Sequence, residues 1–233
     1  MMDIRIIAEG AADRDIIKAI VRAITNVESE NIVSILPSDL VDETDRYSGN
    51  FSDWVIVLEK IADENFLAGT MATVDGDYIL VVHIDTAERG ESGYDINVPV
   101  RTGNVDWKQY AIELREEVKH KMEKLIPAEY RDHIAYAIAI EETEAWIIPM
   151  FEKTRHDTAS HTRPKERLEK IMGADKKLQR QYVNTAKKSL DYQKLGKALV
   201  GELKNCRKKN NSLNAFCIDV EGLYNVSNIE KQK

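Results

Sequence analysis

The stretch IRIIAEGAADRDIIKAIVRAIT, residues 4 to 25, predicts a strand, a tight turn and a helix in immediate succession. IRIIAE is a short, isoleucine-rich run that stops at Gly10, which is typical of a buried strand. From Asp13 onward, isoleucine, alanine and valine recur at helical spacing, and Asp13 is placed to cap or charge the first turn. A strand joined directly to a helix is the repeating unit of parallel α/β sheets.

The same alternation of strand and helix continues along the chain. Further strands are predicted at residues 32–36, 78–84 and 134–140, and helices at 52–69, 106–125 and 141–151. Polar, glycine-containing stretches at 37–50 and 86–104 predict loops. We therefore expect a mostly parallel sheet with helices on both faces.

The strand pattern stops after Phe151, and the remaining segments are polar and helical in character, including KKLQRQYVNTAKKSL (176–190). We therefore predict two parts: an α/β domain at residues 1–152, and a basic helical extension at residues 153–233 that packs on or beside it.

Charge is distributed unevenly along the 233 residues, although the net charge is only −7. Residues 1–152 contain 14 Lys and Arg against 31 Asp and Glu, whereas residues 153–209 contain 17 against 6. The acidic part would repel a polyanion unless a metal neutralised its carboxylates, and the basic part could hold phosphates. The alternative is that both parts are ordinary solvated faces.

Several classes of protein are disfavoured by the sequence. No apolar run reaches the length of a membrane span, and the N-terminus MMDIRII lacks the features of a signal peptide, so we predict a cytoplasmic protein without membrane contact. Cys206 and Cys217 form no CxxC motif, so they do not indicate a zinc site. Nucleotide binding is a weaker alternative, because neither GxxxxGK[ST] nor GxGxxG occurs.

Carboxylates follow three of the predicted strands. Glu9, Asp85 and the pair Glu142 and Glu144 each stand where an apolar run ends. Because parallel strands end at one edge of a sheet, these acids could converge on Mg²⁺ or Mn²⁺. The structural alternative makes Glu9 a solvent-facing strand end, Asp13 a helix cap and Glu142 a charge favoured at a helix start. His83 is predicted to be a packed, hydrogen-bonded histidine on the same side of its strand as Asp85.

Three motifs together resemble the Toprim-like superfamily. They are EGxxD (Glu9 to Asp13), the apolar strand that ends at Asp85, and ExEAW (Glu142 to Trp146). The nearest resemblance is to an E-x-E-A-W branch related to the nuclease domains of the OLD family, and it covers roughly residues 3 to 150. It implies Mg²⁺ bound by a glutamate at Glu9, by an aspartate at Asp85 and by the paired acids Glu142 and Glu144.

One position departs from the superfamily pattern. The second aspartate of a DxD pair would fall at Ala87, so Glu88 or the Glu142/Glu144 pair would have to supply the missing ligand. Otherwise the site would bind metal weakly and would not be catalytic.

The resemblance implies a metal-dependent nuclease that hydrolyses phosphodiesters with Mg²⁺ or Mn²⁺. The catalytic residues would be Glu9, Asp85 and Glu144, with Glu9 or Asp13 as base. The expected metal ligands are Glu9, Asp13, Asp85, Glu142 and Glu144, and the expected nucleic-acid contacts are Arg155, Arg163, Lys165 and Arg167. Relatives further imply an effector of phage defence that works with an ATPase, and a homo-oligomer is compatible with the sequence. The alternative function is a degenerate subunit that only binds a protein partner, which Ala87 favours.

Overall fold

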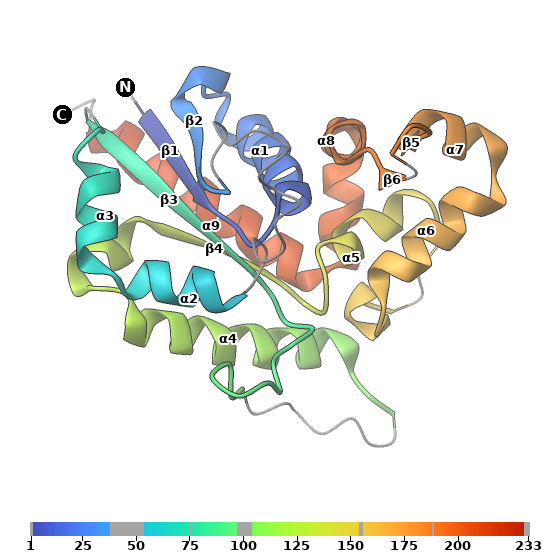
Figure 1. Ribbon diagram of the computed structural model, residues 1–233, viewed down its shortest axis with the longest axis horizontal. Coiled ribbons are helices and arrows are strands. Elements are labelled where there is room, and N and C mark those ends of the chain that lie inside the picture. Colours follow the sequence, from blue (N-terminus) through green and yellow to red (C-terminus); the bar gives the residue numbers. More distant parts are fainter. Residues whose placement is uncertain are drawn as a thin grey trace.

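A four-stranded parallel sheet forms the centre of the molecule in the computed structural model, which describes residues 2–37, 54–74, 76–96, 104–153, 156–187 and 189–230 (Figure 1). The strands are β1 (Met2–Ile7), β2 (Ile32–Leu36), β3 (Asp77–Asp85) and β4 (Ile134–Ala139). Their order across the sheet is β2-β1-β3-β4, and every pairing is parallel. The predicted α/β class is therefore confirmed, and the arrangement is consistent with a Toprim-like fold.

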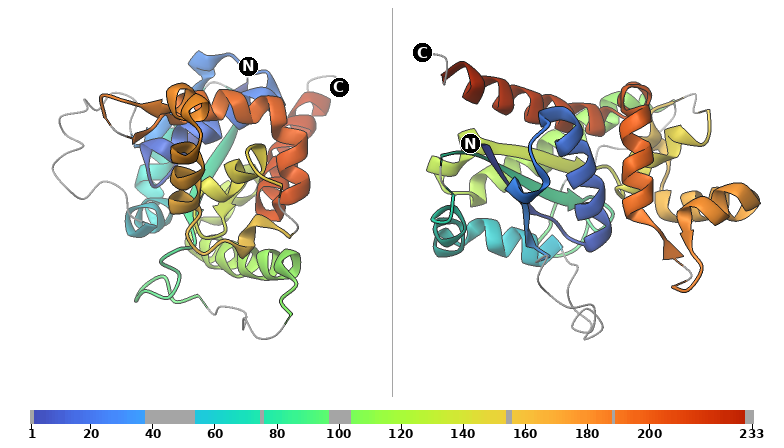
Figure 2. Two further views of the ribbon diagram at one scale, coloured as in Figure 1. Left: turned by 90° about the vertical axis from the view of Figure 1, so that its right-hand side faces the viewer. Right: turned by 90° about the horizontal axis from the view of Figure 1, so that it is seen from above.

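Helices cover both faces of this sheet (Figure 2). The helices in the first two thirds of the chain are α1 (Ala11–Thr25), α2 (Trp54–Ala62), α3 (Glu64–Met71), α4 (Trp107–Leu125) and α5 (Glu144–Ile147). Those that follow are α6 (Pro164–Ala174), α7 (Lys176–Tyr182), α8 (Tyr192–Lys209) and α9 (Asn211–Glu230). Short 3₁₀ turns occupy Ser29–Asn31, Ala128–His133, Ile148–Met150 and Thr158–Ser160.

Strand alternation divides the buried side chains into two cores. Ile79 and Val81 of β3 pack on the face covered by α1, α8 and α9. Leu80, Val82 and Ile84 point to the opposite face, under α2, α3 and α4. Because β3 is buried on both faces, it reads as a continuous apolar run, which is what made it recognisable in the sequence.

The C-terminal segment builds part of the first core. Leu213, Phe216 and Val220 of α9 are fully buried together with Ile4 and Ala137 of the sheet. The segment therefore packs directly on the α/β layer, while the division of the chain at residue 152 stays a prediction.

Three predicted helices need correction. The predicted helix at 52–69 is two helices, because Asp63 leaves helical geometry and its carboxylate accepts the N–H of Phe66 at 3.1 Å, which starts α3. The predicted helix at 141–151 shrinks to α5 and a 3₁₀ turn, because Glu141 has a left-handed φ of 64°.

The third correction concerns KKLQRQYVNTAKKSL. Only its first part is helical, and residues beyond Tyr182 form a small antiparallel hairpin of β5 (Val183–Asn184) and β6 (Ser189–Leu190). Asn184 is the cause, because its side-chain oxygen accepts the N–H groups of Ala186 and Lys187 at 3.1 and 3.2 Å and so closes a turn.

The predicted loops fall partly within the described residues. Residues 86–96 form turns, whereas most of the predicted loop at 37–50 and residues 97–103 lie outside them. Among the described helices, none combines the length and apolar character needed to cross a membrane.

Candidate metal centre

Strands β1, β3 and β4 run toward the same edge of the sheet, beside α5 (Figure 1). An acidic pocket of about 620 Å³ lies where these strands end. Seven carboxylates and one lysine contribute to its lining: Glu9, Asp13, Asp85, Glu88, Glu91, Glu142, Glu144 and Lys165. All five predicted metal ligands therefore line one pocket.

The first carboxylate is fixed by the neighbouring strand. Ile7 of β1 is level with Val82 of β3, so Glu9, two residues beyond Ile7, reaches the end of β3. There its Oε1 accepts the backbone N–H of Asp85 at 2.6 Å. Glu9 thus joins two strand ends and presents its carboxylate at the edge of the sheet.

Asp85 is held by side chains behind it. Its Oδ1 accepts a hydrogen bond from Oγ1 of Thr143 at 3.3 Å and lies 3.3 Å from Nε2 of His83. The Thr143 hydroxyl in turn lies 2.8 Å from the same His83 nitrogen. His83 and Thr143 are completely buried, and the indole of Trp146 packs edge-on against the imidazole. His83 is therefore the packed, hydrogen-bonded residue expected from the sequence, and it supports Asp85.

A polar clamp holds the ends of β3 and β4 together. The Oγ1 of Thr86 accepts the N–H of Glu141 at 2.8 Å, and the N–H of Thr86 lies 3.1 Å from the carbonyl oxygen of Glu141. Arg89 pairs with the Glu141 carboxylate at 2.9 Å and donates to the Thr86 carbonyl at 2.6 Å. Glu141 is thus a structural residue, although it adjoins the site in sequence.

The paired acids are anchored by the C-terminal segment. Glu142 accepts the backbone N–H of Lys165 at 2.8 Å, so its carboxylate caps the first turn of α6. Glu144 accepts a short hydrogen bond from the hydroxyl of Tyr192, the first residue of α8. Both acids therefore depend on residues well beyond the predicted α/β domain.

Trp146 of the ExEAW motif anchors α5 to the C-terminal helices. Its indole N–H donates to Oγ of Ser212 at 2.9 Å, and its ring stacks on Phe216 at 5.7 Å between centroids. Ser212 donates onward to Asn210, which also contacts Thr158. This buried network ties α5, which begins at Glu144, to the junction of α8 and α9.

Burial and mutual repulsion raise the pKa values of the converging acids. Loss of solvent is the main reason that the pKa of Glu9 lies well above its usual range, and the nearby Asp85 adds to the effect. The pKa of Asp85 is also raised well above its usual range, first by burial and then by repulsion from Asp13 and Glu144. Burial raises the pKa of Glu144 to about 7, against the opposing effect of the Tyr192 hydrogen bond.

The geometry suits a cation. Among the described residues, ligand atoms of Asp13 and Asp85 lie within 4.8 Å of each other and of a ring nitrogen of His83, the residue that supports Asp85. Glu9, Glu142 and Glu144 line the same pocket but do not belong to this close group. A divalent ion would neutralise carboxylates that otherwise repel one another, and oxygen ligands are those that Mg²⁺ and Mn²⁺ prefer. The residues present can therefore hold a metal ion.

Known proteins offer no guide here. The chain matches no protein-family model, no curated protein and no solved structure. Assignment to the Toprim-like superfamily thus stays a prediction, carried by the three motifs and the sheet that presents them.

Other acids surround Ala87 in the pocket. Ala87 lines the acidic pocket, and so does Glu88 on the following turn, whose charge helps to raise the pKa of Asp85. Both replacements that the sequence suggested, Glu88 and the Glu142/Glu144 pair, are therefore present in the pocket.

Of the residues predicted to contact nucleic acid, only some lie at the acidic pocket. Lys165 lines the pocket, whereas Arg163 pairs with Glu166 at 3.1 Å and Arg167 pairs with Glu152. Arg155 lies outside the described residues.

Sequence reasoning missed Thr143 and Tyr192. Thr143 sits inside the quoted ExEAW motif, and its position between two acids was the available signal. Tyr192 lies 48 residues beyond Glu144 and belongs to no motif, so only the fold reveals that it reaches the site.

Proposed function

We propose that the acidic pocket binds Mg²⁺ or Mn²⁺ and hydrolyses phosphodiester bonds of nucleic acid. The observation that carries this proposal is the convergence of Glu9, Asp13, Asp85, Glu142 and Glu144 on one pocket at the carboxyl edge of the sheet. Ligand sites of open α/β sheets lie at this edge.

The chain would hold the cation through carboxylates that are already positioned. Glu9, Asp85, Glu142 and Glu144 each accept a hydrogen bond, which fixes the carboxylate. A divalent ion, when bound, would polarise a phosphate oxygen and lower the pKa of a bound water, so that hydroxide forms near neutral pH.

Other groups of the pocket would bind the phosphate or transfer a proton. The N-terminus of α1 lines the pocket with Gly10, Ala11 and Ala12, whose small side chains allow a phosphate to approach the backbone N–H groups. Glu144, whose pKa is about 7, can gain or lose a proton near neutral pH, and Glu9 and Asp13 are the other candidate bases. Lys165 is placed to contact a phosphate oxygen.

The resemblance to OLD-family nuclease domains extends the proposal to a cellular role. The protein would then act in the cytoplasm as the effector of a phage-defence system, alone as a homo-oligomer or with an ATPase partner. The second candidate function is a protein-binding subunit without activity, and the observation that favours it is the alanine at position 87.

A cleavage assay separates these two functions. Supercoiled plasmid and single-stranded RNA are incubated with Mg²⁺ or Mn²⁺ and with wild type, Asp85→Asn, Glu9→Gln or Glu144→Gln. Glutamine and asparagine keep the shape of the side chain and an oxygen that can accept its hydrogen bond, so the fold should persist. Exposed Glu64 gives the matched control, Glu64→Gln.

We expect cleavage by wild type and Glu64→Gln, and a loss of at least about a hundredfold in the three pocket variants. Equal cleavage by all five proteins would assign the activity to another site or to a contaminant. The absence of metal-dependent cleavage by the wild type on either substrate would favour the binding subunit.

A further inference from the structure

A shallow groove runs between α1 and α8, and we call it the α1/α8 groove. It is lined mainly by α1 and the turn after it, from Asp15 to Asn26, and by one face of α8, from Gln193 to Lys208. Residues of α9, with Lys108 and Asp157, complete the lining of the larger hollow. The two helices lie side by side (Figure 2). Hollows of about 540 and 860 Å³ follow one another along the groove and share Ala23 and Val200.

The two helices are in close contact at Gly196. Gly196 of α8 is buried against α1, and a Cβ built on it would lie 3.0 Å from Cβ of Ala19 and 3.2 Å from the carbonyl oxygen of Asp15. Longer side chains of both helices form the walls of the hollows.

Cations dominate these walls. They are Lys18 and Arg22 of α1, Lys197, Lys204 and Lys208 of α8, and Lys108 of α4. On α8, residues 193, 197, 200, 204 and 208 recur at intervals of three and four, so the lysines occupy one face of the helix.

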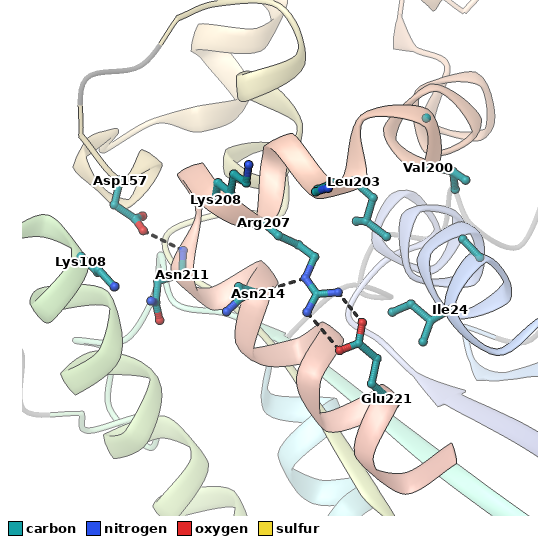
Figure 3. Close-up of a pocket in the computed structure, with 13 residues that line it drawn as sticks. Ile24, Lys108, Asp157, Val200, Leu203, Arg207, Lys208, Asn211, Asn214 and Glu221 are labelled. Atoms are coloured by element: carbon teal, nitrogen blue, oxygen red, sulfur yellow. Dashed lines mark hydrogen bonds and ion pairs between the residues drawn. The ribbon is translucent and has the colours of Figure 1, made fainter. Parts of the chain in front are cut away.

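The acids of the groove are already engaged by neighbouring groups. Asp15 accepts from the Arg14 guanidinium at 2.9 Å. Asp157 accepts the N–H of Asn211 at 2.7 Å, and Glu221 pairs with Arg207 through both of its oxygens (Figure 3). Arg207 is directed toward Glu221 (Figure 3). Seven Lys and Arg line the groove against three acids, so its net charge is positive.

The groove leads away from the acidic pocket. Both helices begin there, since Asp13 in the first turn of α1 and Tyr192 at the start of α8 line that pocket. From Tyr192 to Lys208, α8 extends about 24 Å at about 1.5 Å per residue. A B-form duplex rises about 3.4 Å per base pair, so this length corresponds to about seven base pairs.

We propose that the α1/α8 groove binds the phosphodiester backbone of a nucleic acid whose neighbouring segment enters the acidic pocket. The proposal rests on the nuclease function inferred above and assigns it a substrate path. Backbone contacts by lysines hold a polyanion without reading its sequence. The positive groove compensates for the pocket, which attracts a phosphate only where a cation neutralises its carboxylates.

Binding is tested separately from cleavage. Fluorescein-labelled DNA and RNA, each as a 20-mer single strand and as a duplex, are titrated with full-length protein in Ca²⁺ and in EDTA, and anisotropy is recorded from 50 to 300 mM salt. The test variant is Lys197→Gln/Lys204→Gln. The matched control is Lys176→Gln/Lys177→Gln, which removes two exposed lysines of α7 that lie outside the groove.

The groove variant should bind at least about tenfold more weakly than wild type, and its salt slope should fall by about two, one for each lost phosphate contact. The control should stay within about twofold of wild type. The four probes show whether the path accepts DNA, RNA or both, in single- or double-stranded form. Circular dichroism verifies that both variants fold.

Equal affinities of the two variants would overturn the groove proposal, even with an intact cleavage activity. So would wild-type protein that binds none of the probes. Groove-dependent binding without metal-dependent cleavage by the wild type would instead overturn the nuclease function and support the groove as a binding surface.

Discussion

Asp85 shows how single side chains prepare this site. An aspartate at the end of a buried strand has two oxygens and several rotamers, and a bound ion needs it in one of them. Thr143 fixes Oδ1 with a hydrogen bond, and His83 lies 3.3 Å from the same atom. Asp85, which lines the pocket, is thus held in place before an ion binds.

Thr143→Val removes the hydroxyl at nearly constant volume. We expect weaker divalent-metal affinity, because Asp85 loses its partner, and a free energy of unfolding lower by about 1–3 kcal/mol, because the buried imidazole also loses its contact. Thr143→Ser keeps the hydroxyl and should restore most of the metal affinity. Isothermal titration with Mn²⁺ and urea denaturation measure the two effects. Metal affinity that is the same in valine and serine variants would exclude a positioning role.

The pH dependence of stability tests the buried carboxylates. Folding raises the pKa of Glu144 from 4.5 to about 7, so the native state keeps a proton that the unfolded chain releases between these values. The free energy of unfolding of metal-free protein should therefore decrease as the pH rises through this window, because the unfolded state binds fewer protons. Glu9 and Asp85 act in the same direction.

Urea denaturation at pH 5 and pH 8 in EDTA measures this decrease. Glu144→Gln should reduce the difference between the two pH values, whereas Glu64→Gln should leave it unchanged. Mg²⁺ at pH 8 should stabilise wild type, because it binds the folded carboxylates. An identical pH dependence in wild type and Glu144→Gln would contradict a raised pKa of the buried Glu144 carboxyl.

Much of the site could be predicted from residues alone, for a physical reason. Glu9, Asp85 and Glu144 each follow an apolar run, and parallel strands bring their ends to one edge, so pattern and topology suffice to group them. Tyr192 could not be predicted. It contacts Glu144 through the packing of a helix that lies 48 residues further along the chain, and no local periodicity or motif signals that contact.

Packing between elements places Tyr192 where it is needed. α8 begins at Tyr192, which contacts Glu144, and one turn further along it packs closely against α1 at Gly196. The position of one carboxylate thus depends on a helix–helix contact outside the pocket.

Gly196→Ala should destabilise the protein despite the higher helix propensity of alanine. Alanine gains about 1 kcal/mol in a helix interior, whereas forcing apart a packed contact costs about 1–3 kcal/mol. The new Cβ would lie 3.0 Å from Ala19, so α8 must move away from α1. Gly201→Ala on the same helix has nothing within 4 Å and should be neutral or stabilising. Thermal denaturation compares them, and a melting temperature that rises equally in both would contradict the close contact.

Helices and strands were predicted correctly where the apolar pattern alone defines them. The prediction failed where a side chain forms a hydrogen bond with the nearby backbone. The IVSIL strand has its predicted bounds, 32–36, because burial alone defines it. Asp63 and Asn184 overturned helical patterns by hydrogen-bonding the backbone, an effect that apolar periodicity does not register.

The molecule as a whole combines an acidic pocket with a cationic groove. The uneven charge along the chain anticipated this, since the acids come from strand ends in the first 152 residues and most of the groove lysines come from α8. Charge counting could not show that the groove lies along α1, because that requires the packing of α8.

A chain that ends at residue 152 tests whether the two predicted parts fold separately. It lacks α8 and α9, so the face of the sheet that includes Ile4 and Ala137 would be exposed to water. We expect such a fragment to aggregate or to lose fixed tertiary structure, as measured by near-ultraviolet circular dichroism and gel filtration. A monomeric fragment with a cooperative thermal transition would instead establish residues 1–152 as an independent domain.

Metal binding tests the proposed centre most directly, because it requires neither a known substrate nor turnover. Free Mn²⁺ is followed by electron paramagnetic resonance during titration of wild type, Asp85→Asn and Glu64→Gln at pH 8. Wild type and Glu64→Gln should bind Mn²⁺ with the same affinity, and Asp85→Asn should bind it at least about tenfold more weakly. Unchanged Mn²⁺ affinity in Asp85→Asn would contradict a metal centre at the strand ends.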